Sequence, residues 1–446
     1  MSAAGDTIYA LSSAPGRAGV AVFRLSGPGA RQALERLAGA LPAPRRASLR
    51  VLRHPEGAEI DRGLVLWLPG PESFTGEDMA ELQVHGSRAV AAALAEALGR
   101  LKGFRLAEPG EFSRRAFENG RLDLTEAEGL ADLIDAETEA QRRQAVAQME
   151  GAAGRLYDGW RARLMRALAH LEAELDFSDE GDVPGSLRQE VLAEAAALEK
   201  EIVRHLADGR RGERLREGVR VVIAGPPNAG KSTLMNALAQ RDVAIVSARA
   251  GTTRDVIEVH LDLAGFPVIL TDTAGLREAG DEIEEEGVRR AKRALERADL
   301  LLWLDPMGGE PVAPPRLEGQ ILVHVRSKCD LATDSAPVRS GESAELAISV
   351  PRDWGIDALI ERIAEAARDL CGSGEEPAIS RARHRAALEE CAAALSRFAQ
   401  GARAGTSTEL LAEELRLASR ALGRLTGRVD VEDLLAVIFA DFCIGK

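Results

Sequence analysis

The chain has 446 residues, more than one ordinary hydrophobic core holds, so we expect two to four domains. Its hydrophobic fraction of 45% and charged fraction of 29% are those of a soluble globular protein. The net charge of −14 excludes a broadly basic nucleic-acid-binding surface. Any RNA contact needs a local basic patch, for which Arg210–Arg220 and Arg381–Arg385 are candidates. The alternative interpretation is that these arginines lie on solvated helix faces.

The cysteines indicate a reducing compartment. Cys329, Cys371, Cys391 and Cys443 lie far apart, which argues against a zinc site and a disulfide framework. Residues 1–10 lack the apolar run of a signal peptide, and no segment approaches the ~18 apolar residues of a membrane span. We therefore expect a cytoplasmic protein without a membrane partner.

Residues 1–118 predict an α+β domain. Short apolar runs at Ile8–Leu11, Val20–Leu25 and Gly63–Leu68 alternate with Gly/Pro turns and indicate strands. A helical pattern covers Arg88–Leu101.

Helical patterns dominate the next part of the chain. Thr125 and Glu128 match a capping box, and a helical pattern continues to about Leu175. A second helix presents Leu192, Ala195, Leu198, Ile202 and Leu206 on one face. Helical character returns near residue 377 and runs to the end. This return predicts one discontinuous helical domain, formed by residues 119–215 and 375–446, with an insert between its two parts.

The insert, residues 216–374, alternates strands with helices. The expected strands are Val219–Ala224, Val256–Leu263, Val268–Thr271, Leu300–Leu304 and Ile321–Val325. The expected helices are Lys231–Ala239, Glu284–Arg297 and Ile356–Leu370. Such alternation predicts a mainly parallel sheet flanked by helices on both faces, so the expected fold class is multidomain α/β and α.

A phosphate-binding loop follows the first strand of the insert. Residues 225–232 read Gly-Pro-Pro-Asn-Ala-Gly-Lys-Ser, the G-x-x-x-x-G-K-[ST] pattern. Glycines let backbone N–H groups curl around a phosphate at a helix N-terminus, where the helix dipole favours negative charge. Lys231 is expected to reach the β- and γ-phosphate oxygens, and Ser232 to bind Mg²⁺.

Three later segments complete a guanine-nucleotide site. Asp272–Gly275 supplies an acidic residue for Mg²⁺ and a glycine near the γ-phosphate, and Gly251–Asp255 forms a first switch with a threonine on the metal. In Ser327–Asp330, the Asp330 carboxylate suits guanine N1 and N2, which adenine cannot match. Together these segments predict that the insert binds GTP.

The nucleotide site departs from the usual GTPase pattern at three positions. Ser327 stands where Asn is usual, and Ser349-Val350-Pro351 replaces the Ser-Ala-Lys/Arg loop, although Val350 still offers its N–H to guanine O6. Leu276 occupies the position of the water-orienting Gln of Ras-type GTPases. The acidic run Glu282–Glu286 could orient the water instead, or it could simply be an acidic helix N-terminus.

The whole chain resembles the MnmE (TrmE) family of tRNA uridine-modification GTPases. The resemblance rests on its domain order and on separate motifs. These are Asp6–Ile8, Pro15–Gly19, Arg24–Gly27, Phe74–Asp78, Glu81–Gly86, Pro109–Phe112, Arg115–Phe117, Asn119–Leu124 and the terminal Cys443–Lys446.

The resemblance implies an N-terminal domain that mediates homodimerisation and binds a tetrahydrofolate derivative, in its 5-formyl or 5,10-methylene form. The residues at matching positions are Arg24, Glu81, Arg121 and Lys446. Cations suit the anionic groups of folate, and Glu81 suits the pterin ring. Position 121 usually carries Lys in the family.

The resemblance also implies that K⁺ activates hydrolysis when two G domains meet. Asn228, Ser247, the Arg249 carbonyl and Thr252 would hold K⁺, while Glu284 would orient the water. The implied Mg²⁺ ligands are Ser232, Thr253 and Asp272. The full set expected at the nucleotide and its ions comprises Asn228, Ala229, Gly230, Lys231, Ser232, Thr233, Ser247, Ala248, Arg249, Ala250, Gly251, Thr252, Thr253, Asp272, Thr273, Ala274, Gly275, Ser327, Lys328, Cys329, Asp330, Ser349, Val350 and Pro351.

The implied function is addition of a carboxymethylaminomethyl or aminomethyl group to carbon 5 of the tRNA wobble uridine. The implied partners are tRNA and the flavoprotein MnmG (GidA), in a heterotetrameric-type complex. Cys443 is either a catalytic nucleophile activated by Lys446 or a core residue of an apolar helix. Two alternatives are a switch-type GTPase of ribosome assembly without folate chemistry, and a folate-dependent transferase with a vestigial G domain.

Overall fold

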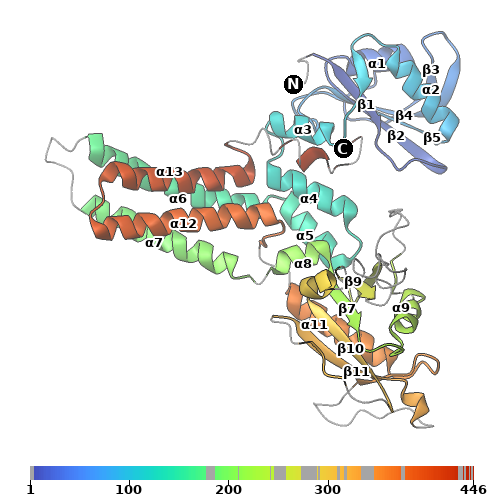
Figure 1. Ribbon diagram of the computed structural model, residues 1–446. Coiled ribbons are helices and arrows are strands. Elements are labelled where there is room, and N and C mark those ends of the chain that lie inside the picture. The colour runs from blue at the N-terminus through green and yellow to red at the C-terminus, as the bar shows by residue number, and fades with distance from the viewer. Residues whose placement is uncertain are drawn as a thin grey trace. The chain divides into compact units, whose positions relative to one another are not determined.

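The structure, a computed structural model, consists of two compact units (Figure 1). Unit 1 comprises Met1–Ala131 and Gly423–Lys446, and unit 2 comprises Asp132–Leu422. The structure describes residues 5–176, 186–208, 210–241, 243–245, 258–272, 289, 292–308, 312–315, 319–332, 346–372, 377–429, 435, 438–440, 442 and 445.

Unit 1 contains a six-stranded sheet in the order β3-β4-β5-β2-β1-β6. Its strands are β1 (Thr7–Leu11), β2 (Ala18–Ser26), β3 (Ser48–Arg53), β4 (Glu59–Leu68), β5 (Met79–Gly86) and β6 (Phe104–Leu106). The β1–β6 pair is parallel, and the other pairs are antiparallel. Helices α1 (Ala30–Ala38) and α2 (Arg88–Gly99) share a core with β2, where alternate residues such as Phe23 and Leu25 point inward. The predicted α+β character is confirmed.

Helix α4 (Leu124–Asp135) begins earlier than its sequence indicated. Thr125 and Glu128 are buried inside the helix, so the capping box predicted there is wrong. Instead, Asp123 Oδ1 accepts a hydrogen bond from the Glu126 backbone N–H (2.9 Å), and Glu126 Oε2 accepts one from the Asp123 N–H (2.8 Å). The reciprocal pair of a capping box is therefore present two residues upstream.

The C-terminal end of the chain belongs to unit 1. Phe439 and Phe442 join Leu124 in one hydrophobic cluster, and the Ser12 hydroxyl donates to the Gly445 carbonyl (2.9 Å). Ser12 and Gly445 are more than 400 residues apart in the sequence, so local periodicity cannot predict that they meet. The division of the chain at residues 118, 215 and 374 stays a prediction.

Unit 2 contains long helices that bury one face each. These helices are α5 (Glu139–Met149), α6 (Ala152–Asp176), α7 (Ser186–Leu206), α12 (Ala382–Ala404) and α13 (Thr408–Thr426), the last of which ends in unit 1. On α7, the predicted apolar positions Ala195, Leu198 and Ile202 are buried. Within the described residues, no helix has both the length and the apolar character needed to cross a membrane.

A second six-stranded sheet lies in unit 2, in the order β12-β11-β10-β7-β9-β8. Its strands are β7 (Val219–Ala224), β8 (Glu258–Leu263), β9 (Phe266–Asp272), β10 (Leu300–Pro306), β11 (Ile321–Ser327) and β12 (Leu346–Ala347). Among these strands, the β8–β9 pair is antiparallel and the other pairs are parallel.

Central strand β7 is buried on both faces, as expected for a parallel strand. Val221 and Ile223 share a core with α9 (Lys231–Ala239) and α11 (Ile356–Cys371), whereas Val222 packs on the other face with Ala294 and Leu295. The predicted mainly parallel sheet with helices on both faces is confirmed.

Several arginines of the two candidate basic patches have carboxylate partners inside unit 2. Asp132 accepts from Arg216 (2.9 Å) and from Arg381 (2.7 Å), and Arg385 donates to Asp208 (2.9 Å). Arg214, on α8 (Arg211–Glu217), pairs with Asp299 across 2.7 Å. These pairs link distant segments and favour a structural role for the arginines over RNA contact.

Native-state thiol labelling should separate the buried cysteines from Cys443. Burial raises the pKa of Cys371 and of Cys391 to about 12, and it also raises that of Cys329. The Cys371 and Cys391 thiols therefore carry almost no thiolate at pH 8, so iodoacetamide should leave them unmodified for hours, and Cys329 should react more slowly than a free cysteine. Peptide mass mapping after a short pulse measures this.

Rapid labelling of Cys443 in the same experiment would favour its role as a nucleophile. Protection equal to that of Cys391 would favour core packing. Labelling in 6 M guanidinium, where all four thiols should react, is the control.

Candidate functional sites

The phosphate-binding loop joins β7 to α9 in a conformation that requires glycine. Gly225 has φ of 148°, and a Cβ atom there would lie 2.2 Å from the Leu304 carbonyl oxygen of the neighbouring strand. Asn228 and Gly230 also adopt positive φ, of 62° and 93°. The loop thus turns sharply into the N-terminus of α9, where free backbone N–H groups and the helix dipole favour an anion.

Lys231, Ser232 and Asp272 meet at this loop. The Lys231 ammonium donates to the carbonyls of Gly225 (3.1 Å) and Pro226 (3.0 Å), so its charge lies over the loop. The Ser232 hydroxyl donates to Asp272 Oδ2 (2.6 Å), because β7 and β9 are parallel neighbours and both end here. The pairing of hydroxyl and carboxylate oxygens predicted for Mg²⁺ is therefore present in the fold.

The loops after β11 and β12 form the other end of the nucleotide site. The Ser327 hydroxyl donates to the Ala229 carbonyl (2.7 Å), and the Cys329 N–H donates to the Ile348 carbonyl (3.1 Å). Ser327 thereby ties the base-recognition loop to the phosphate-binding loop, despite being shorter than Asn.

Among the described residues, two buried oxygens beside these bonds have no hydrogen-bond partner. They are Oδ1 of Asp330 and Oγ of Ser349. A buried polar atom without a partner costs about 1–3 kcal/mol, which a ligand with suitable donors would remove. The N1–H and N2–H groups of guanine are such donors for a carboxylate.

Many predicted nucleotide-site residues lie outside the described residues. They are Ser247, Ala248, Arg249, Ala250, Gly251, Thr252, Thr253, Thr273, Ala274, Gly275 and Glu284. Cys443 and Lys446 lie outside them too. The first switch, the K⁺ loop and the water-orienting glutamate therefore stay predictions.

In unit 1, two of the residues predicted for folate, Arg24 and Glu81, lie together. Arg24 on β2 and Glu81 on β5 are cross-strand partners, and their side chains form an ion pair of 3.1 Å. The Arg24 guanidinium lies 5.6 Å from the centre of the Phe74 ring. A Cβ atom on Gly76 would lie 3.3 Å from Cγ of Arg121, so the Arg121 stem borders the same loop.

Two contributors were not singled out from the sequence. Phe74 belongs to the motif Phe74–Asp78, which by itself assigns this residue no role, although an aromatic residue near a predicted cation site is a usable signal. Gly225 was recognised as part of the motif, but the close approach of Leu304 depends on tertiary packing.

Comparison with known proteins places these sites in a family. Residues 7–121 match the model described as GTP-binding protein TrmE N-terminus, and residues 124–443 match the MnmE helical domain. The chain belongs to the MnmE family of tRNA modification GTPases.

The similar proteins extend over the full length of this MnmE-family chain. The tRNA modification GTPase MnmE of Parvibaculum lavamentivorans is 58% identical over 99% of this chain and 100% of that protein. The MnmE proteins of Methylobacterium sp. strain 4-46 and Paramagnetospirillum magneticum are 57% and 53% identical, again over 99% of this chain and 100% of each protein. The predicted family is thus confirmed.

Ser327→Ala should weaken GDP and GTP binding about 2- to 12-fold, the range for one net hydrogen bond of 0.5–1.5 kcal/mol. The substitution removes the bond to Ala229 and frees the base loop from the phosphate loop. Titration with a fluorescent GDP analogue measures the effect. Ser327→Thr, which keeps the hydroxyl, is the matched control and should bind near normally. Equal affinity of Ser327→Ala and the unaltered chain would contradict the tie.

Proposed function

We propose that this MnmE-family chain couples GTP hydrolysis to modification of carbon 5 of the tRNA wobble uridine. In this proposal it acts in the cytoplasm with the flavoprotein MnmG, and a tetrahydrofolate derivative supplies a one-carbon unit. The observation that carries the proposal is the Arg24–Glu81 ion pair beside Phe74, in a unit separate from the nucleotide site. A switch-type GTPase without folate chemistry offers no explanation for these residues.

The residues at the phosphate loop fit Mg²⁺ and GTP. Ser232 and Asp272 place two hard oxygen ligands side by side, which is the donor type that Mg²⁺ prefers. Bound Mg²⁺ would neutralise phosphate charge. Lys231 would exchange its loop carbonyls for phosphate oxygens, and Asp330 would accept from the base.

We further propose that K⁺ acts at Asn228 when two G domains meet in a homodimer. Asn228 is exposed and held at positive φ at the tip of the phosphate loop, so its amide oxygen can face a partner. Ser247, Arg249 and Thr252 would complete the cation site, and Glu284 would orient the attacking water. A cation fixed against the phosphates stabilises charge that develops during hydrolysis.

The cluster in unit 1 fits a folate derivative by its chemistry. Arg24 and Glu81 are partly exposed, with 24% and 18% of their side chains accessible, so a ligand can reach both. Glu81 can accept from the N–H groups of a pterin ring, Phe74 offers a ring face, and Arg24 and Arg121 suit anionic groups. Lys446 is a further proposed contact.

Turnover in KCl and NaCl at matched ionic strength tests the nucleotide part. We expect KCl to raise the GTP hydrolysis rate about tenfold or more. In other enzymes, one fixed group that stabilises transition-state charge changes kcat by about 10²–10³-fold. Asn228→Ala should abolish the stimulation. Asn236→Ala, an exposed asparagine on α9, is the matched control and should keep it. Equal rates in both salts would remove the K⁺ mechanism.

Isothermal titration with 5-formyl-tetrahydrofolate tests the folate part. Glu81→Gln should weaken binding about 10- to 100-fold, because a hydrogen bond to a charged group is worth about 1.5–3 kcal/mol. Arg31→Ala removes a solvent-exposed ion pair on α1 and should bind normally. No binding by the unaltered chain, with hydrolysis intact, would favour the switch-type GTPase.

A further inference from the structure

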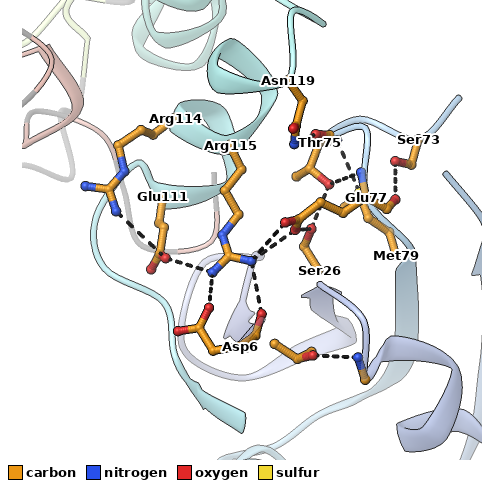
Figure 2. Close-up of polar contacts among 12 residues, drawn as sticks. Asp6, Ser26, Ser73, Thr75, Glu77, Met79, Glu111, Arg114, Arg115 and Asn119 are labelled. Carbon is orange, nitrogen blue, oxygen red and sulfur yellow. Dashed lines mark hydrogen bonds and ion pairs between the residues drawn. The ribbon is translucent and has the colours of Figure 1, made fainter. Parts of the chain in front are cut away.

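A buried ion cluster holds the base of the loop that carries Phe74. Arg115, on α3 (Glu111–Glu118), is 4% exposed, and Figure 2 shows its guanidinium among three carboxylates. It donates to Glu77 (3.0 Å), Asp6 (2.7 Å) and Glu111 (3.2 Å). Burial by itself would raise the pKa of Glu111, yet the hydrogen bond from Arg105 and the charge of Arg115 lower it, so the carboxylate stays ionised.

Hydrogen bonds from β2 and from the end of α3 hold the rest of this loop, residues 73–78. The Ser26 hydroxyl donates to Glu77 Oε2 (2.7 Å) and lies 2.6 Å from the Thr75 hydroxyl. Asn119, which ends α3, donates its side-chain N–H to the Thr75 carbonyl (2.7 Å). These contacts join the loop to a strand and to a helix, and Figure 2 shows them converging on Thr75 and Glu77.

The same loop also contacts residues proposed for folate. Phe74 lies next to the Arg24 guanidinium, which in turn pairs with Glu81. Gly76 has φ of 80° and packs closely against Asn119 and Arg121. A Cβ atom on Gly76 would lie 3.0 Å from Cβ of Asn119 and 3.3 Å from Cγ of Arg121. A small shift of the loop would therefore move Phe74 away from Arg24 and alter the space beside Arg121.

We propose that Asn119 and Arg115 are positioning residues for the one-carbon-carrier site, acting through the 73–78 loop. The inference rests on the proposed folate binding and deepens it. Arg115 bonds to the loop through Glu77, and Asn119 bonds to it through the Thr75 carbonyl, so we expect both to act on the ligand through the backbone that bears Phe74. This role also gives a reason why the motif residues form one bonded set, in which Thr75 and Glu77 connect Ser26, Arg115 and Asn119.

Asn119 offers the sharper test, because it is exposed and its replacement spares the buried charges. We expect Asn119→Ala in the full chain to weaken binding of 5-formyl-tetrahydrofolate about five- to tenfold, the loss of one hydrogen bond. Asn119→Asp keeps the shape but cannot donate to Thr75, so it should lose at least as much. Glu118→Ala, one residue earlier and pairing only loosely with Arg114 (3.8 Å), is the control and should bind normally.

Thermal unfolding and GTP hydrolysis of Asn119→Ala should match those of the unaltered chain. A double-mutant cycle with Phe74→Leu then identifies the route of the effect. If Asn119 acts through Phe74, adding Asn119→Ala to Phe74→Leu should change the dissociation constant less than about twofold. If the effects of the two substitutions on the binding free energy add fully, Asn119 does not act through Phe74 and the positioning role is wrong.

The two proposals fail differently. Unchanged affinity of Asn119→Ala, while the unaltered chain binds the folate, overturns the positioning role alone. A parallel loss of thermal stability and affinity in Asn119→Ala would indicate a merely structural residue and also overturn it. No folate binding by the unaltered chain overturns both proposals.

Discussion

Arg115 can be buried only because carboxylates surround it, since an unpaired ion inside a protein costs several kcal/mol. Paired charges also join other distant segments of this chain. Asp132 forms ion pairs with Arg216 and Arg381. Arg214 forms an ion pair with Asp299, the residue that precedes β10. Guanidinium groups suit such junctions because their planar fork donates in several directions at once. Each pair fixes a relative position that hydrophobic contacts alone would leave less specific.

The same constraint governs how charge is used in a chain of net charge −14. The arginines that looked like basic patches are occupied by Asp132, Asp208 and Asp299, so local sequence enrichment does not equal a basic surface. In unit 1, the Arg24–Glu81 pair is about as accessible as the Arg214–Asp299 pair, so accessibility does not separate it from the pairs that stabilise the fold. What distinguishes it is the Phe74 ring beside the Arg24 guanidinium.

Both proposed sites depend on neighbouring strands that are remote in sequence. In unit 2, parallel strands β7, β9 and β11 bring Ser232, Asp272 and Ser327 to one edge of the sheet. In unit 1, antiparallel register sets Arg24 opposite Glu81. The proposed nucleotide site combines loop backbone and a helix N-terminus with a few side chains, whereas the cluster proposed for folate rests on side chains of adjacent strands.

The sequence by itself determined the phosphate loop, the parallel insert and the family, because glycine spacing, strand–helix alternation and contiguous motifs are local properties. Helix α9 has the bounds that its pattern predicted. Tertiary structure decided what depends on distant partners. The return of Phe439 and Phe442 to unit 1, the Ser327–Ala229 bond and the contact of Phe74 with Arg24 all join residues whose mutual distance no local pattern records. Burial and pairing of charge are properties of the folded chain, because only folding removes water from a side chain and brings its partner near.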